Sequence, residues 1–243
     1  MFSLLKKEVQ SYFYSPLAYV ISALFVLLYS LSFISWLFNA NATNIPFSFP
    51  AIFYSQFFYF IFLIPMLTMK TFAEERRGNT EVLLMSSPLN VFKIVMAKFL
   101  GIAVVLFLIM ALTFFFPIMT AIFGDVKWGS LFCGYLGFFF WGMGCVAVGM
   151  LMSSFTENQI IAAVLGEATM LALYFLDIIY QTDFVQNHSG LASFLGAISP
   201  KNKFEFFAKG VFRLSDLIFY LLFIVVFLGW TMISVEKRKW KRG

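Results

Sequence analysis

Charged residues are scarce in this chain. They make up 12% of its 243 residues, whereas about 25% is usual for a soluble globular domain. Hydrophobic residues account for 61%, and the mean hydropathy is +0.89. This balance excludes a disordered chain and an ordinary cytosolic domain, and it indicates a protein that crosses a membrane several times.

Cysteine and histidine are almost absent as well. Because His188 is the only histidine, a His-rich metal site cannot form. The two cysteines, Cys133 and Cys145, share one apolar run, and on a straight helix they would lie about 18 Å apart along the axis. This separation is too large for a disulfide bond, so we expect both to be packing residues.

The sequence also lacks the motifs of common catalytic and nucleotide-binding sites. The dipeptide Gly-Lys never occurs, so the chain cannot build the Gly-rich phosphate-binding loop of ATPases. A nucleophile elbow, a zinc-protease helix and a Cys-x-x-Cys pair are missing too. The basic residues flank apolar runs instead of forming a basic face for nucleic acid. We therefore expect no catalytic residue, no metal or cofactor bound by this chain, and no nucleic-acid partner.

The hydrophobic residues that are present fall into six runs, each close to the roughly 20 residues of a membrane-spanning helix. The runs cover about 17–38, 51–69, 99–123, 130–152, 159–180 and 216–235. The third run contains Pro117, and such a proline often kinks a membrane helix. We predict a single all-α integral membrane domain with six transmembrane helices.

The remaining segments are short, and each has a distinct expected position. Residues 1–16 carry apolar side chains at helical spacing, which predicts an amphipathic helix in the membrane interface. Residues 70–90 are the expected cytoplasmic segment, and residues 181–215 are the expected outer segment. Twelve of the 17 Lys and Arg residues then lie on the inner side, as the positive-inside rule favours. We therefore expect both termini in the cytoplasm, although Lys201 and its basic neighbours fall outside.

The segment between the second and third runs concentrates charge of both signs. Its cluster consists of Glu74, Glu75, Arg76 and Arg77. Gly78 and Asn79 then break the helix. Thr80 is placed to cap a second short helix, with Glu81 in its first turn and Leu84 on its apolar surface. Such a helix suits docking into a groove on a partner protein, and a solvated connector is the alternative.

Two acidic residues lie inside the fifth run. An ionisable residue at that depth costs several kcal/mol if it faces lipid, so it marks a functional hypothesis. Glu167 lies either at a subunit interface or polar path, or it is a protonated or paired structural acid. Asp177 is closer to the outer end of the run, where we expect it to be solvated.

Two helix faces stand out by their side chains. The fourth run has a face of small residues that lets helix backbones approach closely: Gly142, Cys145 and Gly149. The outer segment has an apolar face that indicates an amphipathic helix at the membrane interface, either structural or a gate at the outer exit: Phe204, Phe207 and Val211.

Residues 62–84 resemble the signature of type-2 ATP-binding-cassette (ABC) exporter permeases. They read Phe-Leu-Ile-Pro-Met-Leu-Thr-Met-Lys-Thr-Phe-Ala-Glu-Glu-Arg-Arg-Gly-Asn-Thr-Glu-Val-Leu-Leu, and Pro88 follows. Asn79 departs from the Gly-Thr pair of many members. The resemblance extends over nearly the whole chain and is greatest to the gliding-motility-associated permease subfamily. It includes the stretches 6–8, 15–16, 98–101, 156–159, 209–211 and 216–220.

This resemblance implies an assembly. Such permeases have six spans, an N-terminal interfacial helix, a cytoplasmic coupling helix between spans two and three, and short outer helices before the last span. They act in the bacterial inner membrane as homodimers or heterodimers, with two separate ABC ATPase subunits that bind ATP and Mg²⁺. A periplasmic accessory subunit is a further expected partner in a gliding-type assembly. By position, the expected ATPase contacts are Glu74, Glu75, Arg76, Arg77, Thr80, Glu81 and Leu84.

The expected function is transport, without catalysis by this chain. The first hypothesis is the permease subunit of an ABC exporter, driven by a separate ATPase through the coupling helix. The alternative is a membrane anchor or scaffold of a motility or maturation complex, in which the partner ATPase performs mechanical work without solute transport. A third hypothesis is an ion-coupled carrier that uses Glu167.

Overall fold

The computed structural model describes residues 2–43, 49–81 and 90–241, and the regular elements in these ranges are helices. The first are α1 (Phe2–Tyr14), α2 (Pro16–Thr43), α3 (Phe49–Thr68) and α4 (Lys70–Arg77). Next come α6 (Val91–Thr113), α7 (Phe115–Phe123), α8 (Trp128–Phe155) and α9 (Gln159–Tyr180). The last are α10 (Asp183–Gln186), α11 (Ser189–Ile198), α12 (Pro200–Ala208) and α13 (Leu214–Lys241).

Six helical segments in the described ranges are long and apolar enough to cross a membrane. They are Pro16–Asn39, Ile52–Arg77, Val91–Ile122, Trp128–Phe155, Gln159–Tyr180 and Leu214–Arg238. Each has between 22 and 32 residues, which is more than the roughly 20 that a bilayer requires. The prediction of an all-α integral membrane protein with six transmembrane helices is confirmed.

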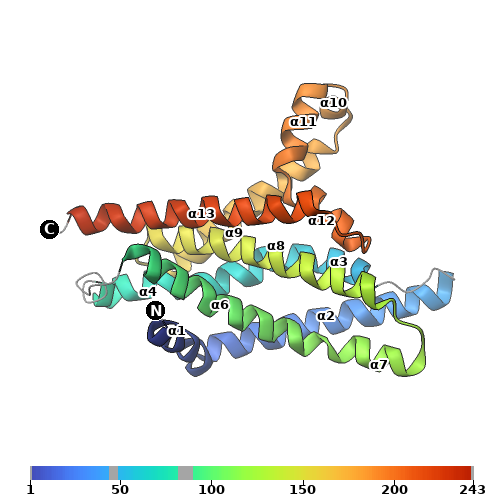
Figure 1. The fold of residues 1–243 in the computed structure, drawn as a ribbon, viewed down its shortest axis with the longest axis horizontal. Coiled ribbons are helices and arrows are strands. Elements are labelled where there is room, and N and C mark those ends of the chain that lie inside the picture. Colours follow the sequence, from blue (N-terminus) through green and yellow to red (C-terminus); the bar gives the residue numbers. More distant parts are fainter. Residues whose placement is uncertain (1, 44–48, 82–89, 242–243) are drawn as a thin grey trace.

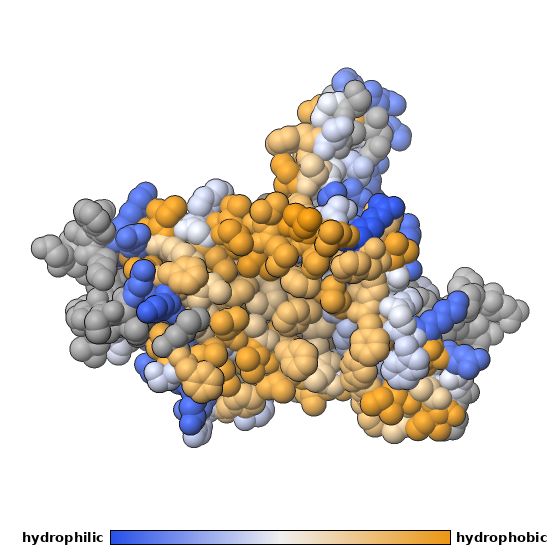
Figure 2. Space-filling view, viewed as in Figure 1, coloured by the Kyte–Doolittle hydropathy of each residue, from blue (hydrophilic) through white to orange (hydrophobic). Residues whose placement is uncertain are grey.

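The long helices run roughly side by side along the long axis of the molecule (Figure 1). The helices α1 and α4 and the C-terminal part of α13 lie at one end, which we call the terminal end. The α7 and α12 helices lie at the other end, called the opposite end, where α10 and α11 project away from the bundle. Figure 2 shows a hydrophobic band between two more hydrophilic ends, as expected for a bundle that spans a bilayer.

The α8 helix is the centre of the bundle and packs against α3, α9, α12 and α13. Aromatic side chains fill this core. Trp141 of α8 stacks on Phe57 of α3 with ring centres 4.0 Å apart, and Phe138 stacks on Phe60 at 4.2 Å. Such pairs add about 0.5–1.5 kcal/mol beyond the burial of their area, so they hold α3 and α8 together.

Pro117 divides the third span into α6 and α7. Proline has no amide hydrogen, so Pro117 cannot donate to the carbonyl of Thr113, and its ring crowds that carbonyl. The helix is interrupted at Phe114, between these two residues. The interruption of this span at the proline, which the sequence indicates, is therefore present in the structure.

The α1 helix lies against α6 and joins α2 through a single non-helical residue, Ser15. Leu4, Glu8 and Tyr12 form its buried face, whereas Phe2 is exposed on the other side. An exposed aromatic residue fits a helix that enters the membrane interface. The buried Glu8 brings a carboxylate to the inner side of this helix, close to α4 and α6.

Candidate functional site

The short helix α4 is anchored by a side chain from the central helix α8. Its first residues lack a side-chain cap of their own. The hydroxyl oxygen of Ser153 accepts hydrogen bonds from the amides of Phe72 at 3.1 Å and Ala73 at 3.2 Å. The same hydroxyl donates to the carbonyl of Met69 at 2.9 Å. Ser153 thereby satisfies the unpaired amides that every helix start presents and binds α4 to α8.

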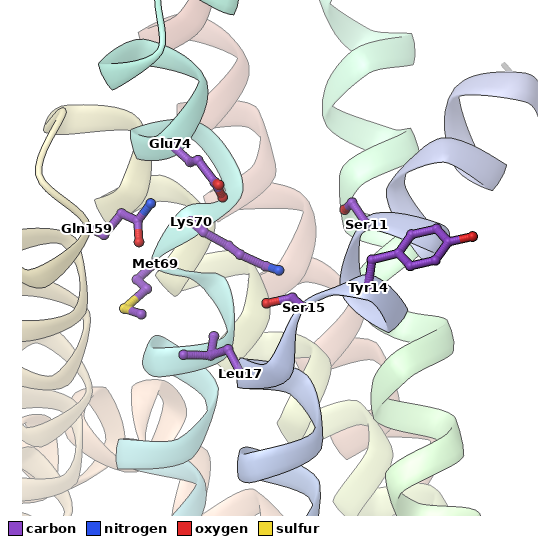
Figure 3. Close-up of a pocket in the computed structure, with 8 residues that line it drawn as sticks. All are labelled: Ser11, Tyr14, Ser15, Leu17, Met69, Lys70, Glu74 and Gln159. Carbon is purple, nitrogen blue, oxygen red and sulfur yellow. The ribbon is translucent and has the colours of Figure 1, made fainter.

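A polar cavity separates α4 from the turn between α1 and α2 (Figure 3). It measures about 470 Å³. Ser11 and Ser15 line it on one side, and Lys70 and Glu74 of α4 line it on the other. Figure 3 shows the Lys70 side chain extending from α4 toward Ser15.

Tyr12 connects α1 to α4 beside this cavity. Its hydroxyl lies 3.4 Å from that of Thr71, and Thr71 donates its own hydrogen to the carbonyl of Thr68, so Tyr12 is the donor. Burial raises the pKa of Tyr12 above its ordinary value, and nearby carboxylates add to this effect, which keeps the hydroxyl protonated. The ammonium of Lys70 lies 4.3 Å from the centre of the Tyr12 ring.

Lys98 joins three helices through a buried ion cluster. Only 2% of its side chain is exposed. Its Nζ lies 2.7 Å from Oε1 of Glu75 in α4 and 3.1 Å from Oε1 of Glu8 in α1. A buried charge is costly unless it is paired and hydrogen-bonded. The cluster therefore holds α1, α4 and α6 in one arrangement.

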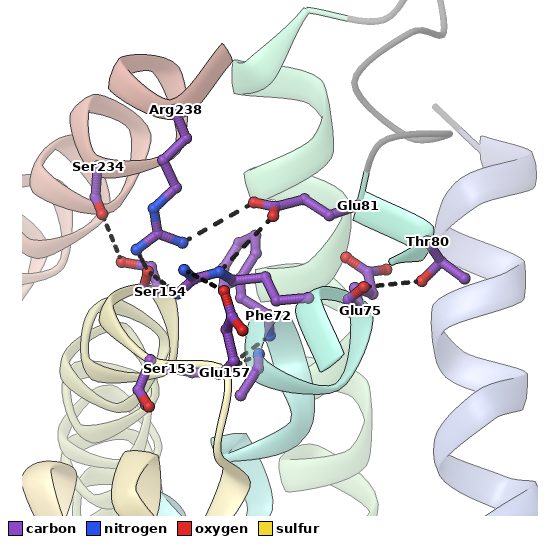
Figure 4. Close-up of polar contacts among 12 residues, drawn as sticks. Phe72, Glu75, Thr80, Glu81, Ser153, Ser154, Glu157, Ser234 and Arg238 are labelled. Carbon is purple, nitrogen blue, oxygen red and sulfur yellow. Dashed lines mark hydrogen bonds and ion pairs between the residues drawn. The ribbon is translucent and has the colours of Figure 1, made fainter. Parts of the chain in front are cut away.

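Arg76 is the centre of a second ionic network, drawn in part in Figure 4. Its Nη2 lies 3.1 Å from Oε1 of Glu157 in the turn between α8 and α9. Its Nε lies 3.7 Å from Oε2 of Glu81. Arg238 of α13 lies 3.9 Å from the other oxygen of Glu81 and donates to the carbonyl of Ser154. The network links α4 and the start of the following segment to α8, to the α8–α9 turn and to α13.

The residues expected to contact an ATPase therefore fall into two groups. Glu75, Arg76 and Glu81 face inward and hold the elements together. Glu74 and Arg77 are exposed on α4. The Thr80 hydroxyl donates to the carbonyl of Glu75 at 3.2 Å and so caps the end of α4. Leu84, like the rest of the predicted second helix, lies outside the described residues.

The two acidic residues of α9 differ in their surroundings. Glu167 is partly exposed on the helix surface. Asp177 is only 1% exposed and accepts hydrogen bonds from Ser199 and Gln181. The ammonium of Lys201 lies 3.5 Å from its Oδ2. The expectation that Asp177 is solvated is therefore wrong, because residues of the outer segment fold back and cover it.

The charge of Lys201 is maintained by its neighbours. Burial acts to lower the pKa of this ammonium, but Tyr54, Tyr174 and Asp177 outweigh that effect and hold the pKa above its ordinary value. The ring centres of Tyr174 and Tyr54 lie 4.9 and 5.6 Å from Nζ. Lys201 and Asp177 therefore form a stable ion pair at the base of α12.

The outer helix α12 is inserted into the bundle. Phe204 and Phe207 are fully buried, and a Cβ on Gly137 of α8 would overlap the side chain of Phe207. Val211 does not belong to this face. It lies beyond the end of α12 and is 47% exposed, because the chain turns at Gly210 with a φ of +74°. The expectation of one amphipathic interfacial face through residue 211 is therefore wrong.

The small residues of α8 lie where other helices approach most closely. A Cβ on Gly142 would stand 2.7 Å from Cδ2 of Leu106, and one on Gly149 would overlap the hydroxyl of Thr68. Cys145 is fully buried. These positions therefore contact other helices of the same chain.

Several residues of the two networks were not marked by the sequence. Ser153 and Glu157 bond to α4 from 80 and 81 positions along the chain, and Arg238 pairs with Glu81, which follows α4. The local sequence around these residues does not indicate their partners. The one feature of the sequence that singles out Lys98 is its position as a charged residue next to a long apolar run. Among the described residues, no group of three or more His, Cys, Asp or Glu side chains could hold a metal ion.

Comparison with known proteins identifies one relationship. The model of a protein family described as "ABC-2 family transporter protein" matches residues 2–240, which is nearly the entire chain. No curated protein matches the chain.

Proposed function

Because this chain belongs to the ABC-2 family of transporter proteins, we propose that it is the permease subunit of an exporter driven through α4. The family consists of membrane transport subunits that are not themselves catalytic and that work with an ATPase subunit. The proposal adds the direction of transport and the route of coupling. The ATPase would bind at the terminal end, on the exposed residues Glu74, Arg77 and Thr80.

One observation carries this proposal. The α4 helix is tied to α1 and α6 through Lys98, to α8 through Ser153, and to the turn between α8 and α9 through Arg76. Glu81, which also pairs with Arg76, links this end of α4 to Arg238 of α13. A displacement of α4 by a partner would therefore act on four other helices and on the α8–α9 turn at once. An exposed connector held only by its two ends would not show such ties.

The proposed cycle uses these ties as mechanical links. Binding of ATP and Mg²⁺ would close two ATPase subunits on each other and move both copies of α4. The buried ion pairs resist separation, because breaking one leaves an uncompensated charge. The helices attached to α4 would then move with it and change the exposure of a transport path.

A second permease subunit would complete the transporter, as a homodimer or a heterodimer. The partly exposed Glu167 on α9 supports an interface near that helix, because a carboxyl group facing lipid is costly. We place the assembly in the bacterial inner membrane with both termini in the cytoplasm. The resemblance to gliding-motility-associated permeases supports this placement.

Coupling can be tested on a complex purified through a tag on this chain. Arg77→Ala removes an exposed cation from α4 without touching either buried network. Arginine is among the residues whose truncation at an interface is most costly, so we expect the ATPase subunit to bind on the order of tenfold more weakly. Coupled ATP hydrolysis in proteoliposomes should fall with it, while membrane insertion stays normal.

Lys93→Ala is the matched control, because Lys93 is also an exposed cation at the terminal end. It should leave binding and hydrolysis unchanged. The proposal is wrong if no ATPase copurifies with the wild-type chain, or if the Arg77→Ala complex retains full coupled activity.

The scaffold function is the second candidate, and one feature favours it. The helices α10 and α11 project from the opposite end (Figure 1) and expose the large apolar side chains of Leu191 and Phe194. Exposed apolar residues on a projection fit contact with an accessory subunit outside the cytoplasm. Stable capture of such a subunit, together with ATP hydrolysis that no solute stimulates, would favour the scaffold over the exporter.

A further inference from the structure

The cavity between α4 and the α1–α2 turn lies beside the ends of candidate membrane spans, where lipid headgroups are expected. Two membrane spans begin at its edge, at Pro16 and Gln159. Leu17 and Met69 contribute apolar side chains to its lining, and the two serines and the charged residues contribute polar groups. The volume of about 470 Å³ falls within the range of about 300–1,000 Å³ that is usual for small-molecule sites.

Lys70 presents a cation to this cavity. Within the described parts of the chain, no carboxylate lies within ion-pair distance of the Lys70 ammonium. This ammonium lies over the ring of Tyr12. Glu74 is four residues further along α4, but a Lys that precedes a Glu by four is the less favourable order for pairing. The nearby Glu8 and Glu75 are both bound to Lys98. An anionic ligand group can therefore reach Lys70.

Glu74 adds a negative charge to the same cavity. An anion with no positive group of its own would be attracted by Lys70 and repelled by Glu74. A ligand that carries both charges satisfies both residues. Lipid headgroups with a phosphate and a primary ammonium have this pattern, and the phosphate is the group nearer the acyl chains.

We propose that this cavity binds the headgroup of an aminophospholipid of the phosphatidylethanolamine type. The phosphate is held by the ammonium of Lys70 and the hydroxyl of Ser15, toward which Lys70 extends (Figure 3). The ethanolamine ammonium donates to the carboxylate of Glu74. The glycerol end of the lipid rests on Leu17 and Met69. A choline headgroup fits less well, because its quaternary ammonium has no N–H to donate.

The proposal can be tested by native mass spectrometry of the full-length chain purified in detergent. The probes are phosphatidylethanolamine, phosphatidylglycerol and phosphatidylcholine with identical acyl chains, and inorganic phosphate serves as a competitor. Wild-type protein should retain phosphatidylethanolamine in preference to the other two lipids. Lys70→Gln should weaken its binding about tenfold, the scale of one charge-assisted hydrogen bond. Lys93→Gln, the same change on an exposed lysine of the same end, should have no effect.

Glu74→Gln is a second test variant. It changes an exposed residue that does not support the fold. This variant should lose the preference for phosphatidylethanolamine over phosphatidylglycerol, even if the Lys70 variant does not fold. Equal binding of all three lipids to the wild type, or equal effects of Lys70→Gln and Lys93→Gln, would overturn the proposal. Displacement of the lipid by inorganic phosphate would show a site for free anions instead. These outcomes do not depend on any ATPase, so they are separate from the test of coupling.

Discussion

At the scale of single residues, Lys98 shows how a charge is accommodated next to an apolar helix. Its partners Glu8 and Glu75 lie 90 and 23 positions away in the sequence. In the sequence, Lys98 directly precedes the third apolar run, and that position contains no information on its partners. Folding buries the ammonium and places two carboxylates against it.

Removing this ammonium should strongly destabilise the protein. Lys98→Met leaves Glu8 and Glu75 without their cation, and loss of one partner from a buried ion cluster costs about 3–5 kcal/mol. We expect a clearly lower unfolding temperature of the purified chain, measured by intrinsic fluorescence. Lys93→Met, on an exposed residue, is the control. Adding Glu8→Gln and Glu75→Gln to Lys98→Met should restore part of the stability, and wild-type stability of the single variant would contradict the role of the cluster.

At the scale of secondary structure elements, α12 differs most from its sequence-based expectation. The alternation of Phe and charged residues predicted a helix on the membrane surface. The structure instead inserts Phe204 and Phe207 beside Gly137 of α8. Asp177 and Lys201 are then paired at the base of this helix. Amphipathicity alone does not distinguish a lipid surface from a protein groove, because both present an apolar surface below a polar one.

The ion pair at the base of α12 should hold this helix in place. Asp177→Asn removes the charge that faces Lys201 and keeps a side chain of similar size. We expect backbone amides of residues 200–208 to exchange with deuterium on the order of tenfold faster, measured by mass spectrometry. Glu205→Gln is the control, because its pair with Lys209 is exposed and such pairs contribute little. Equal exchange in the Asp177→Asn variant and the wild type would contradict this role.

At the scale of the whole molecule, the described parts of the chain place α1, α4 and the C-terminal part of α13 at one end (Figure 1). Some of the basic residues at the opposite end, which do not follow the positive-inside rule, have partners in the fold. Lys201 pairs with Asp177 and Lys209 pairs with Glu205, while the guanidinium of Arg213 stacks 3.3 Å from the centre of the Phe206 ring. These contacts do not change the count of Lys and Arg, so the proposal of a cytoplasmic terminal end rests on the excess of basic residues that the sequence assigns to that side.

This orientation can be measured by thiol labelling in intact cells. Ser3 and Thr182 are exposed at the two ends of the bundle, while the native cysteines are both buried. A membrane-impermeant maleimide should label the Thr182→Cys variant from outside. It should label the Ser3→Cys variant only after the membrane is permeabilised. The reverse pattern would contradict cytoplasmic termini.

The sequence by itself determined the number of spans, the interruption near Pro117 and the position of the charged segment around α4. These features depend on the length, polarity and backbone chemistry of contiguous residues, which are local properties. The face of small residues on α8 was also visible, because helical spacing alone brings Gly142, Cys145 and Gly149 together.

Only the tertiary structure decided which charged groups meet. The pairs of Lys98 with Glu8, of Arg76 with Glu157 and of Asp177 with Lys201 join different elements. The same is true of the cavity around Lys70 and of the insertion of α12. The energy of a charge depends on the groups within a few ångströms of it, and in a helical bundle those groups come from segments that are distant in the sequence.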